Sequence, residues 1–147
     1  MIIYTSGDMF KIKVEAVVNA VNTQGISGKG LALYFKKRFP RNYKLYRELC
    51  KGTGMEPGTI LVTDCGEGVY NWIVNLSTKD AWYYSSKEEW IIRGLFQLRD
   101  WLSDNKIKSI VIPPLGCGNG GLDWVAVKYQ IGKILSNLET KIYVFEP

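Results

Sequence analysis

Two glycine-rich stretches have the residue types needed to bind an anion. The first places Gly25, Gly28 and Gly30 between an apolar run at 16–21 and a second apolar run at 31–35. Glycine lets the backbone approach a ligand closely, and the first N–H groups of a following helix have no partner inside it. Those N–H groups also lie at the positive end of the helix dipole. The spacing predicts a phosphate site or, on a purely structural interpretation, only a tight turn.

The second stretch, residues 115–122, also follows an apolar run and precedes a helical pattern. Its glycines match GxGxxG, the dinucleotide-binding fingerprint, at Gly116, Gly118 and Gly121. Glu146, at the end of the following strand, adds to this likeness. Against a dinucleotide site, Pro113 and Pro114 stand where the strand should lead into the turn, and no further unit follows to complete a doubly wound sheet. We expect the backbone amides of this stretch to bind an anion.

The side chains available for catalysis are restricted. The sequence has no histidine, and its three cysteines, Cys50, Cys65 and Cys117, lack paired metal-ligand spacing. A Ser-His or Cys-His nucleophile and a histidine general base are excluded, and neither a metal nor a cofactor is expected. Any catalysis must rest on Lys, Asp, Glu, Tyr, Asn or the backbone.

The length and composition suit a single domain. The 147 residues, 46% of them apolar, are enough to bury a core. The first residues lack the basic start and apolar run of a signal peptide, and no stretch approaches the roughly 20 apolar residues of a membrane span. We expect one domain over residues 1–147, a cytoplasmic location and no membrane partner.

The elements that must position these residues alternate between strands and helices. Strands are predicted over residues 1–4, 16–22, 59–63, 70–76, 107–112 and 141–145, with 59–63 and 70–76 forming a hairpin-like pair. Helices are predicted over residues 31–38 and 40–51, after the capping box Ser86-Lys87-Glu88-Glu89, and after Asp123. This interleaving predicts an α/β fold with a largely parallel sheet and helices on both faces.

The net charge of +5 is unevenly distributed. Residues 36–51 contain seven basic side chains and one acidic side chain, Glu48. Arg41, Lys44 and Arg47 recur there at helical spacing with tyrosines between them, as in a surface that binds a polyanion. A solvated helix face would give the same pattern, so the patch by itself does not identify nucleic acid as the partner.

Together these features resemble the macro domain, an ADP-ribose-binding fold, over nearly the whole chain. The matching pieces are Gly7-Asp8-Met9, Asn19-Ala20-Val21-Asn22, Gly28-Lys29-Gly30-Leu31-Ala32, residues 75–79 and residues 113–124. The third piece and the Ser77-Thr78-Lys79 turn are similar to the branch that contains the DarG antitoxins and the terminal ADP-ribose glycohydrolases. The resemblance implies a three-layer α/β/α fold with a central mixed, largely parallel sheet.

The resemblance also implies a role for each matching position. Asp8 would accept a hydrogen bond from the adenine amino group, with Met9 beside it, although an Asp next to a glycine also fits a simple turn. Asn22 would contact the distal ribose, and Lys79 would stand near its anomeric carbon as the main catalytic residue. The other implied ADP-ribose-binding positions are Asn19, Gly28, Lys29, Gly30, Leu31, Thr78, Gly116, Cys117, Gly118, Asn119, Gly120 and Gly121.

Lys79 could take part in glycosidic cleavage in two ways. It could donate a proton to the leaving base, or its neutral amine could attack the ring-opened sugar. Glycohydrolases of the human type carry an acid two residues after Gly-Cys-Gly that helps to resolve a lysyl intermediate, whereas Gly120 occupies that position here. Asp123, three positions further along, is better placed to cap a helix. We therefore favour Lys79 as an acid or electrostatic stabiliser, assisted by Asn22.

The function implied is an ADP-ribosyl glycohydrolase that removes ADP-ribose from thymine in single-stranded DNA, with Arg41, Lys44 and Arg47 steering the strand. The alternatives are hydrolysis of ADP-ribose 1″-phosphate, O-acetyl-ADP-ribose or ADP-ribosylated protein, and a module that binds ADP-ribose without turnover. Because the sequence ends where the macro domain ends, we expect a stand-alone monomer related to toxin–antitoxin systems, such as a phage or plasmid accessory.

Overall fold

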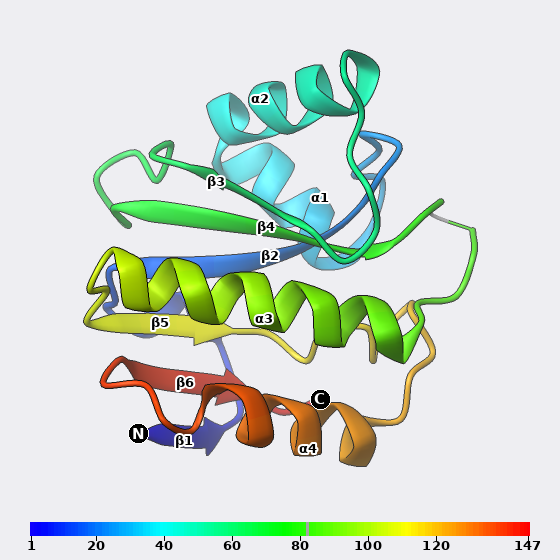
Figure 1. The fold of residues 1–147 in the computed structure, drawn as a ribbon. Helices are drawn as coiled ribbons and strands as arrows, with labels where there is room; N and C mark the ends of the chain where they lie inside the picture. Colours follow the sequence, from blue (N-terminus) through cyan, green and yellow to red (C-terminus); the bar gives the residue numbers. More distant parts are fainter. Residues whose placement is uncertain (82) are drawn as a thin grey trace.

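The computed structural model describes residues 1–81 and 83–147, and six strands form one sheet in that part of the chain (Figure 1). The strands are β1 (Ile2–Thr5), β2 (Ala16–Asn22), β3 (Ile60–Thr63), β4 (Trp72–Lys79), β5 (Ser109–Ile112) and β6 (Lys141–Phe145). Their order in the sheet is β1-β6-β5-β2-β4-β3. β3 runs antiparallel to β4, and the other neighbours are parallel. The mixed, largely parallel sheet and the β3–β4 pairing are therefore confirmed.

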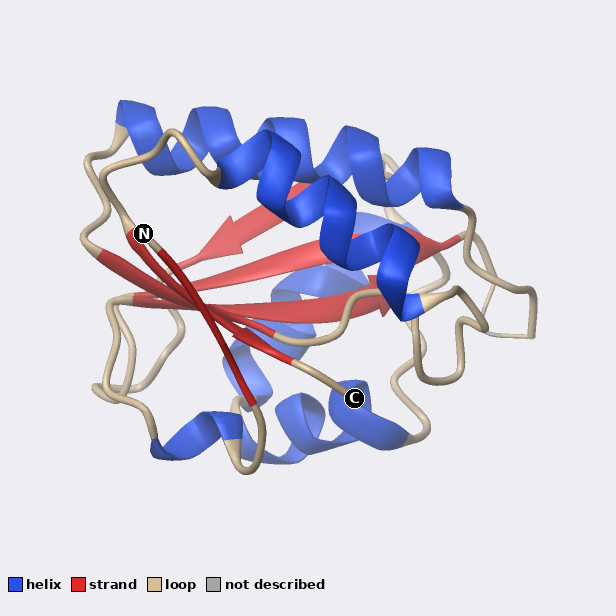
Figure 2. Cartoon of the chain, turned by 90° about the horizontal axis from the view of Figure 1, so that it is seen from below, coloured by secondary structure: helices blue, strands red, loops and turns tan. Residues whose placement is uncertain are grey.

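Helices cover both faces of this sheet, as two perpendicular views show (Figures 1 and 2). α3 (Glu88–Asp104) and α4 (Trp124–Leu135) lie on one face. α1 (Gly30–Arg38), α2 (Pro40–Lys51) and the short 3-10 helix η1 (Met9–Lys11) lie on the other. The predicted three layers are confirmed. Within the described residues, every helix is too short or too polar to cross a lipid bilayer.

Alternating side chains of the sheet fill two cores, because successive residues of a strand point to opposite faces. Val18 and Val74 belong to the core beneath α3 and α4. Their neighbours Val17 and Ile73 belong to the core on the opposite face, where Phe35 of α1 is buried. Both faces of the sheet are covered, which explains why β2 is nearly continuously apolar.

The main differences from the sequence predictions lie around β4 and the start of α3. β4 begins at Trp72 and continues to Lys79, so that Lys79 lies at the end of a strand. The predicted capping box is wrong, because Lys87 is the N-cap of α3 and makes no side-chain cap hydrogen bond. Ser86 is instead buried, and its backbone N–H donates to Gly120 O at 3.0 Å. A tertiary contact thus uses the residue that the local pattern assigned to capping.

The carboxyl ends of β2, β4 and β5 meet at one edge of the sheet, because these strands are parallel neighbours. Asn22 and Lys79 are register partners at that edge, and the register shifts between Val21 and Asn22. Such a shift turns a side chain away from the simple alternation of the strand. The fold therefore places these two residues beside each other although they are far apart in sequence.

Candidate functional site

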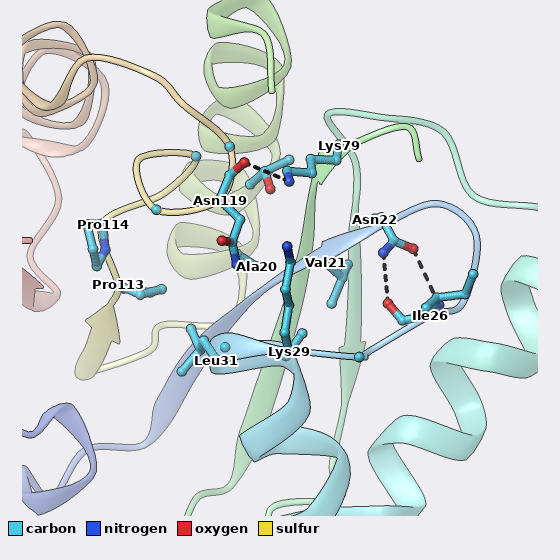
Figure 3. A pocket seen from close by; sticks show the side chains of 17 residues that line it. Ala20, Val21, Asn22, Ile26, Lys29, Leu31, Lys79, Pro113, Pro114 and Asn119 are labelled. Carbon is cyan, nitrogen blue, oxygen red and sulfur yellow. Dashed lines mark hydrogen bonds between the residues drawn. The ribbon is translucent and has the colours of Figure 1, made fainter. Parts of the chain in front are cut away.

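A cavity of about 660 Å³ opens at this edge of the sheet, between the beginning of α1 and the loop that precedes α4 (Figure 3). Its volume is within the range of small-molecule sites. Its walls include Ala20 and Val21 from β2 and two prolines, Pro113 and Pro114, after β5. The predicted site residues that line it are Asn22, Gly28, Lys29, Gly30, Leu31, Thr78, Lys79, Gly116, Gly118, Asn119 and Gly120.

The first turn of α1 presents backbone N–H groups to this cavity. Gly30, Leu31 and Ala32 form that turn, and all three residues line the cavity. Lys29 is the N-cap in an extended conformation, and no side chain in the described part of the chain caps the turn. Gly30 has φ +63°, a left-handed conformation that favours glycine. The arrangement is suited to a phosphate oxygen because the unpaired N–H groups and the helix dipole act together.

The loop before α4 forms the opposite wall. It is closed by a backbone hydrogen bond from Leu122 N–H to Gly116 O (2.9 Å), and Gly116 and Gly121 have φ of +71° and +75°. A Cβ built on Gly30 would lie 3.4 Å from Nδ2 of Asn119, so this loop reaches across to the start of α1. The two predicted anion loops therefore face each other across one cavity.

The side-chain amide of Asn22 has a fixed orientation. Its Oδ1 accepts hydrogen bonds from Gln24 N–H (2.9 Å) and Tyr46 Oη (2.9 Å), and its Nδ2 donates to Ile26 O at 2.8 Å. Figure 3 shows the link between Asn22 and Ile26 at the edge of the cavity. Because the oxygen is turned toward protein donors, the amide can offer a ligand its second N–H group and not its oxygen.

Lys79 connects the end of β4 to the opposite loop. Its Nζ donates a hydrogen bond to Asn119 O at 2.9 Å (Figure 3). Burial lowers the pKa of Lys79, and the charge of nearby Lys29 lowers it further. In Figure 3 the side chains of Lys29 and Lys79 both extend toward the space between the two loops. The cavity thus contains two amines, which can neutralise the negative charge of a bound ligand.

Two features of the loop before α4 exclude an acidic side chain at position 120 and a nucleophilic thiol at Cys117. A Cβ on Gly120 would overlap Gly116 O and Oγ of Ser86, so this loop conformation has no room for an acidic side chain at that position. Burial raises the pKa of Cys117 to about 11, with a further contribution from Asp123. The thiol is therefore protonated at neutral pH and is a poor nucleophile. Asp123 caps α4, as predicted, by accepting a hydrogen bond from Val125 N–H.

Some predicted site residues lie outside the cavity walls. Asp8 caps η1 by accepting from Phe10 N–H at 3.0 Å, which confirms the turn interpretation. Met9 is buried in the core next to α1. Asn19 is also buried, and its Nδ2 donates to Asn75 Oδ1 at 3.2 Å. Cys117 lies between the lining residues Gly116 and Gly118, and Gly121 follows the last lining residue of that loop, Gly120. The ligand contacts expected of these five residues stay predictions.

The structure adds Tyr46, which the sequence analysis did not connect with the site. Tyr46 is buried on α2, and its hydroxyl donates toward both Asn22 O (2.7 Å) and Asn22 Oδ1 (2.9 Å). In the sequence Tyr46 stands among basic residues, and this pattern predicted that it lies on the surface. No local pattern joins α2 to the end of β2, so this contact could be found only in the folded chain.

The basic residues of α2 lie outside the cavity. Arg41, Lys44 and Arg47 are exposed on α2. A Cβ built on Gly25 would lie 3.6 Å from Cγ of Arg47, so Arg47 packs against the loop that follows Asn22. The described residues contain no group of three or more His, Cys, Asp or Glu side chains arranged for a metal ion.

The sequence of this chain is similar to a known protein family and to several characterised proteins. The macro domain family profile matches residues 18–131. The DNA ADP-ribosyl glycohydrolase of Thermus aquaticus is 40% identical over 149 residues, which cover 100% of this chain and 41% of that protein. The DNA ADP-ribosyl glycohydrolase of Mycobacterium tuberculosis is 41% identical over 133 residues, which cover 89% of this chain and 38% of that protein. The chain thus spans about two-fifths of the length of these curated relatives.

Solved structures of proteins named DarG and DarTG are also similar to this chain. The macrodomain of Mycobacterium tuberculosis DarG superposes with a TM-score of 0.95 at 38% identity, covering 100% of this chain and 98% of that one. The structure of Thermosipho africanus DarTG in complex with ADP-ribose superposes with a TM-score of 0.89 at 30% identity, covering 98% of this chain and 41% of that one.

Proposed function

Because the chain belongs to the macro domain family, we propose that its cavity binds ADP-ribose and that the protein removes ADP-ribose from ADP-ribosylated thymine in single-stranded DNA. The similarity to DNA ADP-ribosyl glycohydrolases over the full length of the chain supports this choice of substrate. The observation that carries the proposal is the cavity itself, which joins an uncapped helix N-terminus to Lys79. The first feature suits a diphosphate, and the second supplies a proton donor.

The ligand can be matched to the cavity one chemical group at a time. The diphosphate accepts hydrogen bonds from the first turn of α1 and from the loop before α4, since both present backbone groups to the same space. Lys29 neutralises part of its charge. The distal ribose extends toward the carboxyl ends of β2 and β4, where the free N–H of Asn22 donates to a ribose hydroxyl and Lys79 lies next to the anomeric carbon.

The reaction is a hydrolysis at that carbon. As the bond between the anomeric carbon and the leaving base breaks, positive charge develops on the sugar and negative charge on the base. The Lys79 ammonium donates its proton to the base, a water oxygen bonds to the anomeric carbon, and the amine recovers a proton from that water. The products are free ADP-ribose and unmodified thymine. The negative charge of the bound diphosphate favours the charged form of the Lys79 amine.

Gly120 favours this route over a covalent one. An amine attacking the ring-opened sugar would leave a lysyl intermediate that needs an acid or base for its release. The position at which the resemblance expects such an acid is Gly120, where a side chain would overlap the loop backbone. We therefore assign Lys79 to proton donation and not to nucleophilic attack.

The proposal also concerns the cellular setting. We infer that residues 1–147 form one macro domain and that the protein acts in the cytoplasm, as a monomer, to counteract a DNA-modifying toxin. A relative from Thermosipho africanus is named a DNA ADP-ribosyl transferase–DNA ADP-ribosyl glycohydrolase fusion protein, so the two activities are joined in one chain in that organism.

The test is release of free ADP-ribose from a single-stranded oligonucleotide that carries ADP-ribosylated thymidine. We expect release by the parent protein and a loss of about 10²- to 10⁴-fold in Lys79→Ala, since a positioned acid contributes that much. Lys133→Ala, which removes an exposed lysine of α4, is the matched control and should keep full activity.

Calorimetric measurement of ADP-ribose binding shows whether a negative result comes from the wrong substrate or from a cavity that does not bind ADP-ribose. If the parent protein binds ADP-ribose but releases none from DNA, protein-linked and small ADP-ribose derivatives become the substrates to test. If Lys79→Ala is as active as the parent protein, the mechanism is wrong.

A further inference from the structure

Two tyrosines with largely exposed rings follow Lys79 in the chain. Tyr83 is 64% exposed and Tyr84 is 57% exposed. Their ring centroids lie 4.7 Å apart with an interplanar angle of 56°. The backbone N–H of Tyr84 donates to Ala81 O at 3.1 Å. Aromatic rings this exposed leave apolar area in contact with water that a ligand could cover.

Hydrogen bonds on both sides of the tyrosines hold this segment at the rim of the cavity. Before them, Asp80 O accepts from Thr23 N–H at 3.1 Å, which joins the segment to the loop that follows Asn22. After them, Ser86 N–H donates to Gly120 O at 3.0 Å, which joins the segment to the opposite wall. Lys79 and Gly120 both line the cavity, so Asp80 and Ser86, which stand before and after the tyrosines, each lie next to a cavity wall.

The basic residues of α2 lie on the other side of the same loop. Tyr43 Oη donates to Gly25 O at 3.4 Å, and a Cβ built on Gly25 would lie 3.5 Å from Cα of Arg47. The loop after Asn22 therefore contacts α2 at Gly25 and the tyrosine segment at Thr23. An extended anion that crosses this loop meets positive charge on one side and aromatic rings on the other.

Single-stranded nucleic acid has both kinds of group. Its phosphates bind basic side chains, and its bases stack on aromatic rings with little dependence on sequence. We propose that Tyr83 and Tyr84 form a stacking platform for a base of single-stranded DNA that flanks the modified nucleotide. This inference rests on the proposed function, since it concerns the substrate of the same cavity. It adds base stacking to the phosphate contacts expected of Arg41, Lys44 and Arg47.

The experiment compares two fluorescent strands of equal length and charge, one of oligothymidylate and one of abasic deoxyribose phosphates. Affinity for each unmodified strand is measured by fluorescence anisotropy. The parent protein should bind oligothymidylate about five- to 150-fold more tightly than the abasic strand, which is the range that stacking of one base gives. Tyr83→Ala/Tyr84→Ala should lose this preference and keep its affinity for the abasic strand. Tyr83→Phe/Tyr84→Phe should retain the preference, because phenylalanine also stacks.

Tyr129→Ala is the matched control, because Tyr129 is also 64% exposed but lies on α4. It should bind both strands as the parent protein does. Changing Arg41, Lys44 and Arg47 to glutamine should weaken binding of both strands by the same factor. Equal affinity of ADP-ribose for all variants shows that the tyrosine changes leave the cavity folded.

Binding of unmodified strands involves no turnover, so the two proposals can fail separately. A parent protein that binds the two strands equally, or a double alanine variant that keeps the preference, overturns the platform even if the enzyme is active. A parent protein that shows the tyrosine-dependent preference but releases no ADP-ribose from modified DNA overturns the glycohydrolase assignment and leaves the platform intact.

Discussion

The two residues assigned to catalysis are held in different ways. Asn22 is fixed by hydrogen bonds to its own loop and to Tyr46 of α2, whereas Lys79 makes a hydrogen bond to the loop across the cavity. The first arrangement orients a donor toward the ligand. The second keeps the Lys79 amine at a partly buried position that lowers its pKa. The charge of Lys79 therefore depends on the charge of any ligand in the cavity.

The hydroxyl of Tyr46 should matter for turnover more than for ligand affinity. Tyr46→Phe removes one hydrogen bond to Oδ1 of Asn22, and we expect kcat to fall about two- to tenfold, equivalent to about 0.5–1.5 kcal/mol. The affinity for ADP-ribose should change less than twofold, since the backbone anion sites stay intact. Tyr129→Phe, which changes an exposed tyrosine of α4, is the control and should leave kcat unchanged. A normal kcat in Tyr46→Phe would show that the loop alone orients Asn22.

The activity should fall at high pH. If Lys79 donates a proton, kcat/KM decreases as pH rises through the pKa of Lys79 in the free enzyme. Because burial and Lys29 lower this pKa, the decrease should begin below the usual range of lysine. Lys29→Gln removes one of the two causes and should move the decrease to higher pH. A profile that instead rises with pH would show that the neutral amine is the active form.

At the scale of elements, α2 combines a buried polar face with an exposed basic one. Asn42 of α2 and Asn75 of β4 exchange two hydrogen bonds, at 3.0 and 2.9 Å, and Thr63 of β3 donates to Asn42 Oδ1 at 2.7 Å. All three residues are buried. Buried amides are stable in a core only when they are paired, so this network fixes the position of α2 on the sheet.

The packing of α3 on β4 can be tested at Gly94. A Cβ on Gly94 would lie 2.7 Å from a methyl carbon of Leu76, which is fully buried in the core under α3. We expect Gly94→Ala to lower the free energy of unfolding by about 1–3 kcal/mol, because overpacking outweighs the better helix propensity of alanine. The measurement is urea denaturation of the parent and variant proteins.

Gly132 of α4 offers a matched comparison. Among the described residues, its Cβ would meet only Tyr4 Oη, at an ordinary distance of 3.4 Å. Gly132→Ala should therefore leave stability unchanged or raise it by up to about 1 kcal/mol. Equal effects of the two substitutions would contradict the tight contact between α3 and β4.

At the scale of the whole molecule, the cavity and the basic surface are separate. The cavity lies at the carboxyl edge of the sheet and is lined by two loops. Most of the excess positive charge lies outside it, at the end of α1 and along α2. Charge placed beside a site raises the rate of encounter with a polyanion without changing the contacts inside the site.

This separation predicts different responses to salt. For the oligonucleotide substrate, kcat/KM should fall as salt increases, and changing Arg41, Lys44 and Arg47 to glutamine should reduce the log–log slope by about 2, since each phosphate contact on a single strand contributes about 0.7. The same triple variant should bind ADP-ribose normally. An unchanged slope would remove the basic face of α2 from the strand-binding surface.

The sequence by itself determined the local features of this protein. Helical and strand periodicity, the glycines before α1 and α4, and Asp123 as a cap were all predictable, because each depends on neighbouring residues and on backbone sterics. The absence of histidine and of metal-ligand spacing also follows directly from the sequence. These features were enough to predict the fold class and two glycine-rich loops suited to an anion.

Only the tertiary structure decided which side chains meet. Strand alternation alone would turn Asn19 and Asn22 to opposite faces, but the register shift after Val21 lets Asn22 meet Tyr46 while Asn19 joins the buried amides. Ser86 likewise supports the loop before α4 and does not cap α3. Register and long-range packing depend on residues far apart in the chain, so the pairing of Asn22 with Lys79 exists only once the sheet has formed.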